Sequence, residues 1–138
     1  MTNDEMIAAA INAEAEASGA DPKNVAKVWA LLFGDAACAE YAARFPGAPA
    51  GRARQVMELA KAWHEQGDAK SLWELDKAKG RLIRRPGPGI ASGSNRKGRE
   101  GRRLVSAILA AGNAVNTMYP LTCVQEAVEC FNKELTDV

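Results

Sequence analysis

The sequence contains few of the residues that build metal sites or disulfide frameworks. Its 138 residues include one histidine and three cysteines, and aromatic residues make up 6%. A tetrahedral zinc site would need all four of His64, Cys38, Cys123 and Cys130 to converge. An odd number of cysteines cannot all pair within one chain, so we expect free structural thiols in a reducing compartment. We therefore expect no metal and no cofactor, and a cytoplasmic location in a bacterium, or in the host cytoplasm if a phage encodes the chain.

Long hydrophobic runs are also absent. No apolar run approaches the roughly 18 residues that a membrane span requires, so we expect no membrane partner. The opening residues are acidic rather than basic (Asp4, Glu5), which argues against a signal or transit peptide. Apolar residues make up 47% and charged residues 25%, proportions that exclude wholesale disorder. The length suits one compact domain, and we expect residues 1–138 to form it.

No segment alternates apolar and polar residues with the period of a strand, and β-branched residues are sparse. Apolar residues instead recur at helical spacing, so the chain is predicted to be all-α, a compact bundle of six to seven helices. Gly19, Gly34 and Gly67 are interpreted as helix ends, and Thr122 with Gln125 as a capping box that opens the last helix. The predicted helices are about 3–18, 22–33, 35–45, 50–66, 68–85, 97–117 and 122–136.

The organisation predicted for this domain has three parts. Residues 1–85 form the N-terminal helices, residues 86–96 a basic loop rich in glycine and proline, and residues 97–138 a C-terminal helical hairpin. Several apolar stripes are expected to be buried, among them Val25, Val28, Trp29, Leu32 and Phe33 in one helix and Leu72, Leu75, Leu82 and Ile83 in another.

Charge is distributed very unevenly along the chain. The net charge is +1, but residues 1–76 carry −5 and residues 104–138 carry −3. Residues 77–103 hold ten bases and one acid, a net charge of +9. Like charges at this density repel one another, so acids elsewhere in the fold or a bound anion must offset them. This block is the strongest functional signal in the sequence.

The basic block favours contact with phosphate groups. Arginine binds phosphate or carboxylate with two parallel hydrogen bonds, and glycine-rich backbone at a helix N-terminus attracts anions. A nucleotide triphosphatase is not indicated, because Arg99 and Glu100 follow Gly98 where the phosphate-binding loop of those enzymes has Lys-[Ser/Thr]. The residues expected to contact nucleic acid or another anionic partner are Arg81, Arg84, Arg85, Arg96, Lys97, Arg99, Arg102 and Arg103.

Other motifs carry weaker signals. The predicted helices 50–66 and 68–85 could form a helix-turn-helix, but the bases of the second gather at its C-terminal end, whereas recognition helices read bases near their N-terminus. Trp63 and Trp73 are interpreted as packing residues. His64 and the serines lack a recognisable catalytic context, so no catalytic residue is assigned and the protein is predicted not to be an enzyme.

The sequence therefore predicts a small non-enzymatic protein that contacts a nucleic-acid phosphate backbone, DNA or RNA, through residues 77–103. One alternative is a phage or mobile-element protein that docks on a host macromolecular complex, such as a nucleic-acid-processing machine, and inhibits it. In that case the basic loop would insert into an acidic or nucleic-acid-binding groove of the partner. Another is a structural subunit of an assembly such as a virion. Self-association into a homo-oligomer stays open.

Overall fold

All regular secondary structure in the described part of the chain is helical. The computed structural model describes residues 2–87 and 96–136, with side chains described up to Phe131. Six helices occur within these residues: α1 (Asn3–Ser18), α2 (Pro22–Arg44), α3 (Ala48–Gln66), α4 (Ala69–Arg84), α5 (Arg96–Ala114) and α6 (Pro120–Thr136). The all-α prediction is confirmed. None of the helices in these two ranges is long and apolar enough to cross a membrane.

The helix boundaries follow local chemistry. The side chain of Asp21 accepts a hydrogen bond from the Lys23 amide, and Pro22 occupies the first turn of α2. Asp68 caps α4 in the same way by accepting from the Ser71 amide at 3.0 Å. Gly67 ends α3 in the left-handed conformation, with φ of 67°, which only glycine adopts without strain.

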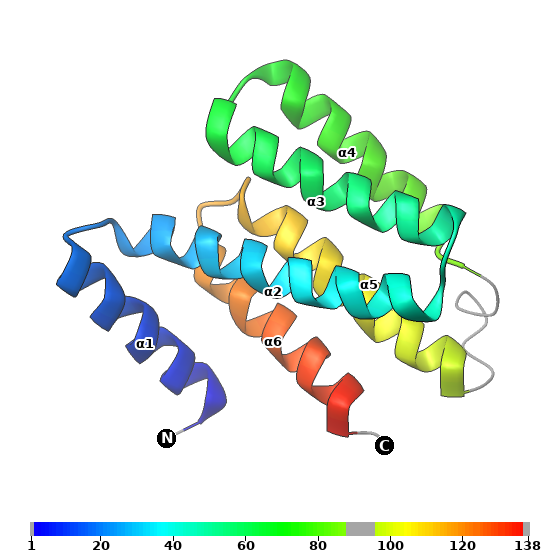
Figure 1. Cartoon of the computed structure of the whole chain (residues 1–138). Coiled ribbons are helices and arrows are strands. Elements are labelled where there is room, and N and C mark those ends of the chain that lie inside the picture. The colour runs from blue at the N-terminus through cyan, green and yellow to red at the C-terminus, as the bar shows by residue number, and fades with distance from the viewer. Residues whose placement is uncertain (1, 88–95, 137–138) are drawn as a thin grey trace.

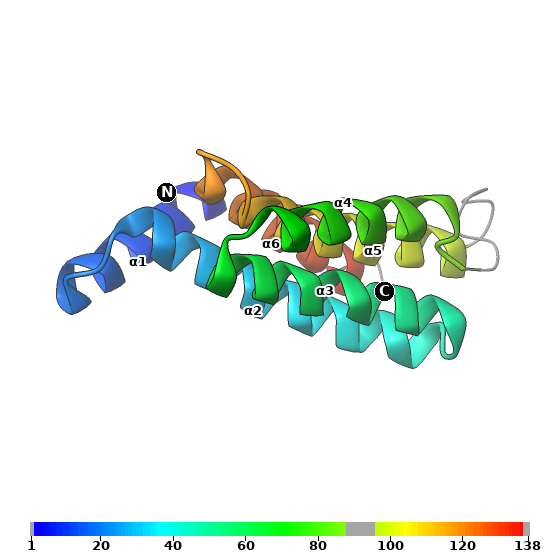
Figure 2. The ribbon, with the colours of Figure 1, turned by 90° about the horizontal axis from the view of Figure 1, so that it is seen from above.

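The helices form two antiparallel pairs around a central helix (Figure 1, Figure 2). Helix α2 packs against α5, and α5 pairs with α6 on one side. The hairpin of α3 and α4 covers α2 and α5 on the other side, and α1 packs on α2 and α6. The first of two apolar clusters joins α2, α3, α4 and α5, and the second joins α1, the start of α2, the end of α5 and α6.

One helix was predicted as two. Gly34 does not end a helix, because α2 runs without interruption from Pro22 to Arg44. A Cβ added to Gly34 would lie 2.5 Å from the Cβ of Ala111 and 2.6 Å from the Cε of Met57. The glycine therefore allows three helices to approach closely. The six-helix version of the prediction is the one observed in the described residues.

Other expectations also need correction. Thr122 and Gln125 lie inside α6, which begins at Pro120, so they form no capping box at its start. Gln125 instead donates a hydrogen bond from Nε2 to the Asp4 carbonyl and ties α6 to α1. Apolar periodicity overestimated burial at Val28, Leu32 and Ile83, which are exposed because no neighbouring helix covers them in the described residues. Most of the predicted 86–96 loop, residues 88–95, lies outside the described residues.

Candidate nucleic-acid interface

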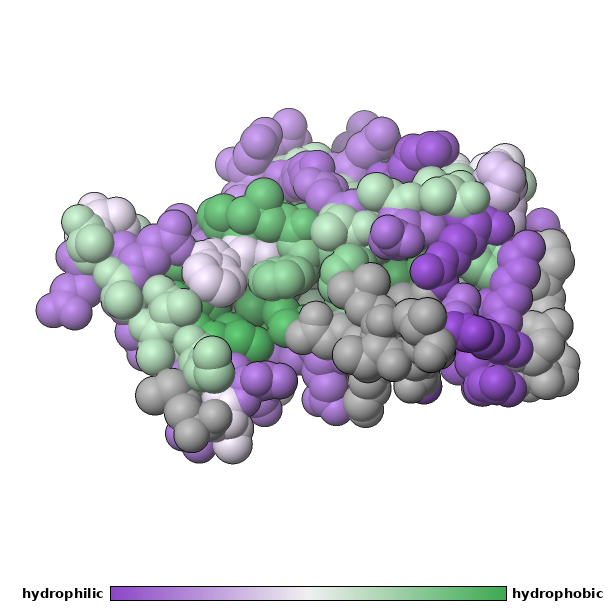
Figure 3. Space-filling model, turned by 60° about the horizontal axis from the view of Figure 1, so that its bottom comes forward, coloured by the Kyte–Doolittle hydropathy of each residue, from purple (hydrophilic) through white to green (hydrophobic). Residues whose placement is uncertain are grey.

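Four helix ends meet at one end of the molecule. These are the C-terminus of α2, the N-terminus of α3, the C-terminus of α4 and the N-terminus of α5, at the right in both ribbon views (Figure 1, Figure 2). In the space-filling view, the most strongly hydrophilic residues gather at this same end, and apolar residues lie toward α1 (Figure 3). We call this region the basic end and define it by Arg44, Arg52, Arg81, Arg84, Arg85, Arg96, Lys97, Arg99, Arg102 and Arg103.

Helix α4 contributes the first group of predicted residues. Arg81 and Arg84 occupy its last turn, where cations interact favourably with the partial negative charge of the helix C-terminus. Arg85 follows as the C-cap, and all three side chains are exposed. Together with Arg52 and Gln55 of α3 they line a cavity of about 430 Å³. We call this the arginine pocket.

Helix α5 contributes the second group. Gly98 and Gly101 are buried, so the basic side chains project from the other positions of this stretch. The side chains of Arg96, Lys97, Arg99 and Arg102 are exposed, and Arg103 is half-buried. The two arginine pairs that the sequence singled out, Arg84 with Arg85 and Arg102 with Arg103, thus lie on helices that meet at the basic end.

Glu100 neutralises part of the α5 surface. Its carboxylate accepts hydrogen bonds at 2.9 Å from Arg44 Nη1 and from Arg96 Nε, and Arg44 also lies 3.7 Å from Glu40. Burial alone would raise the pKa of the Glu100 carboxyl, but the hydrogen bonds and charges of Arg96 and Arg44 outweigh it, so this pKa lies below its ordinary value. The ion pair between Glu100 and Arg44 therefore joins α5 to α2, and the Glu100 carboxylate offsets part of the basic charge.

Lys97 has a different role from the arginines around it. Its Nζ lies 5.2 Å from the centre of the Phe45 ring, within the range of a cation–π interaction. Phe45 is buried at the end of α2. Lys97 thus helps to hold the first turn of α5 against α2.

Sequence reasoning missed two residues of the basic end that belong to α3. Arg52 donates a hydrogen bond from Nε to the Arg85 carbonyl at 2.7 Å, and Gln55 lines the same pocket. Both precede the basic block by many residues, in a segment whose net charge is negative. Only the antiparallel pairing of α3 with α4 brings them beside Arg81 and Arg84, and the sequence carries no local signal for this.

The helix-turn-helix interpretation does not fit the arrangement of α3 and α4. Figure 1 shows the two helices side by side and antiparallel, whereas the DNA-binding motif crosses its helices steeply. Trp63 packs as expected, half-buried and donating from Nε1 to the Val115 carbonyl at 3.0 Å. Trp73 is not a packing residue, because it is 59% exposed, with Lys77 Nζ 3.8 Å from its ring centre.

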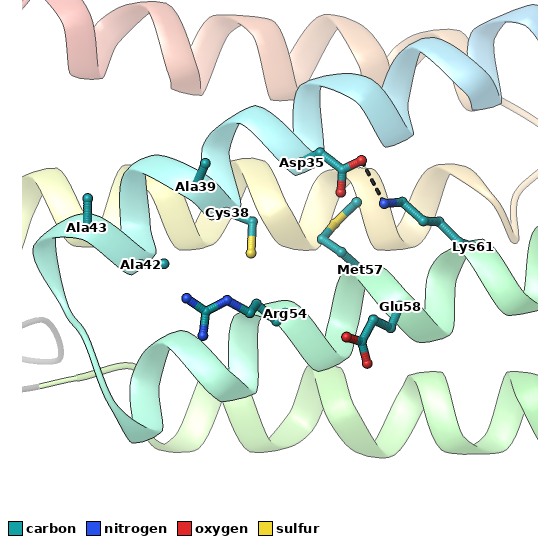
Figure 4. Close-up of a pocket in the computed structure, with 9 residues that line it drawn as sticks. All are labelled: Asp35, Cys38, Ala39, Ala42, Ala43, Arg54, Met57, Glu58 and Lys61. Atoms are coloured by element: carbon teal, nitrogen blue, oxygen red, sulfur yellow. Dashed lines mark ion pairs between the residues drawn. The ribbon is translucent and has the colours of Figure 1, made fainter.

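A second cavity lies between α2 and α3 and has mixed charge. Figure 4 shows Cys38, Arg54 and Met57 around it, with an ion pair of 2.7 Å between Asp35 and Lys61 at one side. The cavity measures about 560 Å³. Burial raises the pKa of the Cys38 thiol, which keeps it protonated and weakly nucleophilic near neutral pH. The described residues contain no cluster of three or more histidine, cysteine or carboxylate side chains that could hold a metal ion.

Comparison with protein-family models, with curated proteins and with solved structures found no match. The function is therefore argued from the charges and geometry of this chain alone. The basic end is the feature that distinguishes its surface, since arginines from four helices gather there.

Proposed function

We propose that this chain is a non-enzymatic binding protein whose basic end contacts the phosphate backbone of a nucleic acid. The observation that supports the proposal most is the convergence of exposed arginines from α4 and α5. Among the side chains of residues 2–87 and 96–131, no ion pair involves Arg81, Arg84, Arg85 or Arg99. Their charges are therefore available to an external anion.

The chemistry favours backbone contact over base recognition. Guanidinium groups bind phosphate oxygens in a two-pronged geometry and release counterions from the nucleic acid. Base stacking would need aromatic side chains among the arginines. Phe45, the ring that Lys97 contacts, is buried and so is not exposed for stacking on a base. We accordingly propose binding with little sequence preference.

The test is a fluorescence-anisotropy titration of labelled DNA and RNA at several salt concentrations. The wild type is compared with the double variant Arg99→Ala, Arg102→Ala, which removes two exposed charges from α5. Because each phosphate contact contributes about 0.9 to the salt slope on duplex DNA, this variant should lower the slope by about 2. A matched control, Lys23→Ala with Lys70→Ala, removes two exposed charges away from the basic end and should leave the slope nearly unchanged.

Two outcomes would overturn the proposal. If the wild type shows no binding at low salt, the basic end serves an acidic protein partner instead. If both double variants lower the slope equally, binding follows net charge and is not localised to the basic end.

A further inference from the structure

The arginine pocket differs from the rest of the basic end in its lining. Arg52 and Gln55 of α3 face Arg81, Arg84 and Arg85 of α4 across a cavity of about 430 Å³. The lining thus supplies four guanidinium groups and one carboxamide, and no carboxylate. A volume of this size falls within the range of small-ligand sites.

The charges in this pocket have no internal counterion in the described residues. Glu100 forms ion pairs with Arg44 and Arg96, neither of which lines the pocket, but no ion pair among the described residues involves Arg52, Arg81, Arg84 or Arg85. Four like charges around one cavity repel one another, and water and salt screen this only in part. A bound dianion would relieve the repulsion, so the pocket favours such a ligand.

One local contact orders a guanidinium group of the pocket. The hydrogen bond from Arg52 Nε to the Arg85 carbonyl fixes one edge of the Arg52 guanidinium and joins α3 to the C-cap of α4. Guanidinium groups that are ordered before binding lose less entropy when they form paired hydrogen bonds with phosphate.

We infer that the arginine pocket binds a terminal phosphate, that is, a phosphomonoester at the end of a nucleic-acid strand. A phosphomonoester carries a charge near −2 at neutral pH and three free oxygens, which match several guanidinium groups at once. An internal phosphodiester carries one charge, and the chain continues on both sides of it, so it suits the open surface of α5 better than a cavity. The inference rests on the proposed function and adds a preference for strand ends.

The experiment compares three versions of one short single strand, labelled at an internal base. They carry a 5′-phosphate, a 3′-phosphate or hydroxyl groups at both ends. The wild type should bind at least one phosphorylated strand more tightly than the hydroxyl strand, on the order of tenfold. The variant Arg81→Ala, Arg84→Ala should lose this preference while still binding the hydroxyl strand, which shows that it is folded.

The matched control is Arg99→Ala with Arg102→Ala, which lies on the basic end but outside the pocket. It should weaken binding of all three strands by a similar factor and keep the preference for the phosphorylated one. Unlabelled nucleoside monophosphate and inorganic phosphate, added as competitors, separate recognition of a strand end from recognition of any phosphate. For a strand end, neither competitor should displace the strand at concentrations comparable to that of the oligonucleotide.

Failure of the inference and failure of the proposed function give different results. If the wild type binds all three strands equally, the inference is overturned and backbone binding stands. If no strand binds but nucleoside monophosphate binds to the wild type and not to the pocket variant, the proposed function falls and the pocket is a site for a free phosphomonoester. If neither strand nor monophosphate binds, both are overturned.

Discussion

Gly34 shows how one residue without a side chain sets the spacing of three helices. It lies in the middle of α2, facing Ala111 of α5 and Met57 of α3 at distances that leave no space for a methyl group. Glycine costs about 1 kcal/mol relative to alanine inside a helix. The close packing of α2 on α3 and α5 has to offset that cost.

Substitution of this glycine should therefore destabilise the protein despite the gain in helix propensity. Gly34→Ala is expected to lower the free energy of unfolding by about 1–3 kcal/mol, the usual range for overpacking a core. The control is Gly51→Ala in α3, where no atom lies within 4 Å of an added Cβ. That change should stabilise the protein by about 0.5–1 kcal/mol. Urea unfolding of both variants tests the comparison, and stabilisation by both would contradict it.

Tyr41 carries a buried hydroxyl without a hydrogen-bond partner in the described structure. Because an unpartnered hydroxyl retains its desolvation penalty, Tyr41→Phe should raise the free energy of unfolding by about 1 kcal/mol. The exposed Tyr119→Phe should change it by less than about 0.5 kcal/mol. A loss of stability in Tyr41→Phe, measured by urea unfolding at neutral pH, would mean that the hydroxyl has a stabilising partner.

Alkaline pH provides a second measurement at Tyr41. Burial raises the pKa of Tyr41 to about 12, against a smaller opposing effect of Arg52. The fold thus favours the neutral hydroxyl, and the associated stability is present below pH 10 and is lost as the pH rises toward 12. Tyr41→Phe should lose less stability than the wild type over this interval, in unfolding curves recorded at each pH.

At the scale of the helix, the contact of Glu100 with Arg44 and Arg96 joins the start of α5 to the end of α2. The pKa of the Glu100 carboxyl is lower in the folded protein than its ordinary value of 4.5. Its contribution to stability is therefore fully present above pH 4.5 and is lost as the pH falls through the lower pKa of the folded state. Glu100→Gln should reduce stability at pH 7 by about 0.5–1 kcal/mol and show a weaker decline below pH 4.5.

The matched control for this element is Glu16→Gln in α1, an exposed carboxylate for which no ion pair is seen in the described residues. It should retain the acid dependence of the wild type. Thermal unfolding from pH 7 to pH 3 gives both comparisons. Identical pH profiles for Glu100→Gln and the wild type would show that the link between α5 and α2 contributes nothing.

The sequence predicted helix boundaries well where the determinants are local. Gly19 and Gly67 act through their own backbone conformation, and each ends a helix in the structure. The glycine at position 34 was misinterpreted because its role depends on helices that are distant in the chain. Periodicity likewise identifies an apolar face, but only the arrangement of the other helices decides whether that face is covered, as the exposed side chains of Leu32 and Ile83 show.

The candidate site was predictable in part for the same reason. The arginines of α4 and α5 could be found by counting charges along the sequence, because they lie close together in one block. Arg52 and Gln55 could not be found in this way, because a tertiary contact between antiparallel helices places them in the pocket. The pairing of Arg44 with Glu100 could not be found either, because it depends on the contact between α2 and α5.

At the scale of the whole molecule, the charge is polarised along the bundle. Helix α1 contains four acidic residues and no base, and it lies at the end away from the convergence of arginines (Figure 1, Figure 2). An extended polyanion should therefore be attracted to one end and repelled from the other. Under the proposed function, this polarity would orient the protein on a nucleic acid without any base-specific contact.

The most direct test of this account is a nuclear magnetic resonance titration of the ¹⁵N-labelled protein with a short DNA duplex at low salt. The account predicts that amide signals shift at the C-terminal turn of α4 and in the first turns of α5, with α1 unaffected. These shifts should shrink as salt is added, because phosphate contacts are salt-sensitive. Shifts centred on α1 or on the groove between α2 and α3, or no shifts at all, would contradict the proposal that the basic end is the binding surface.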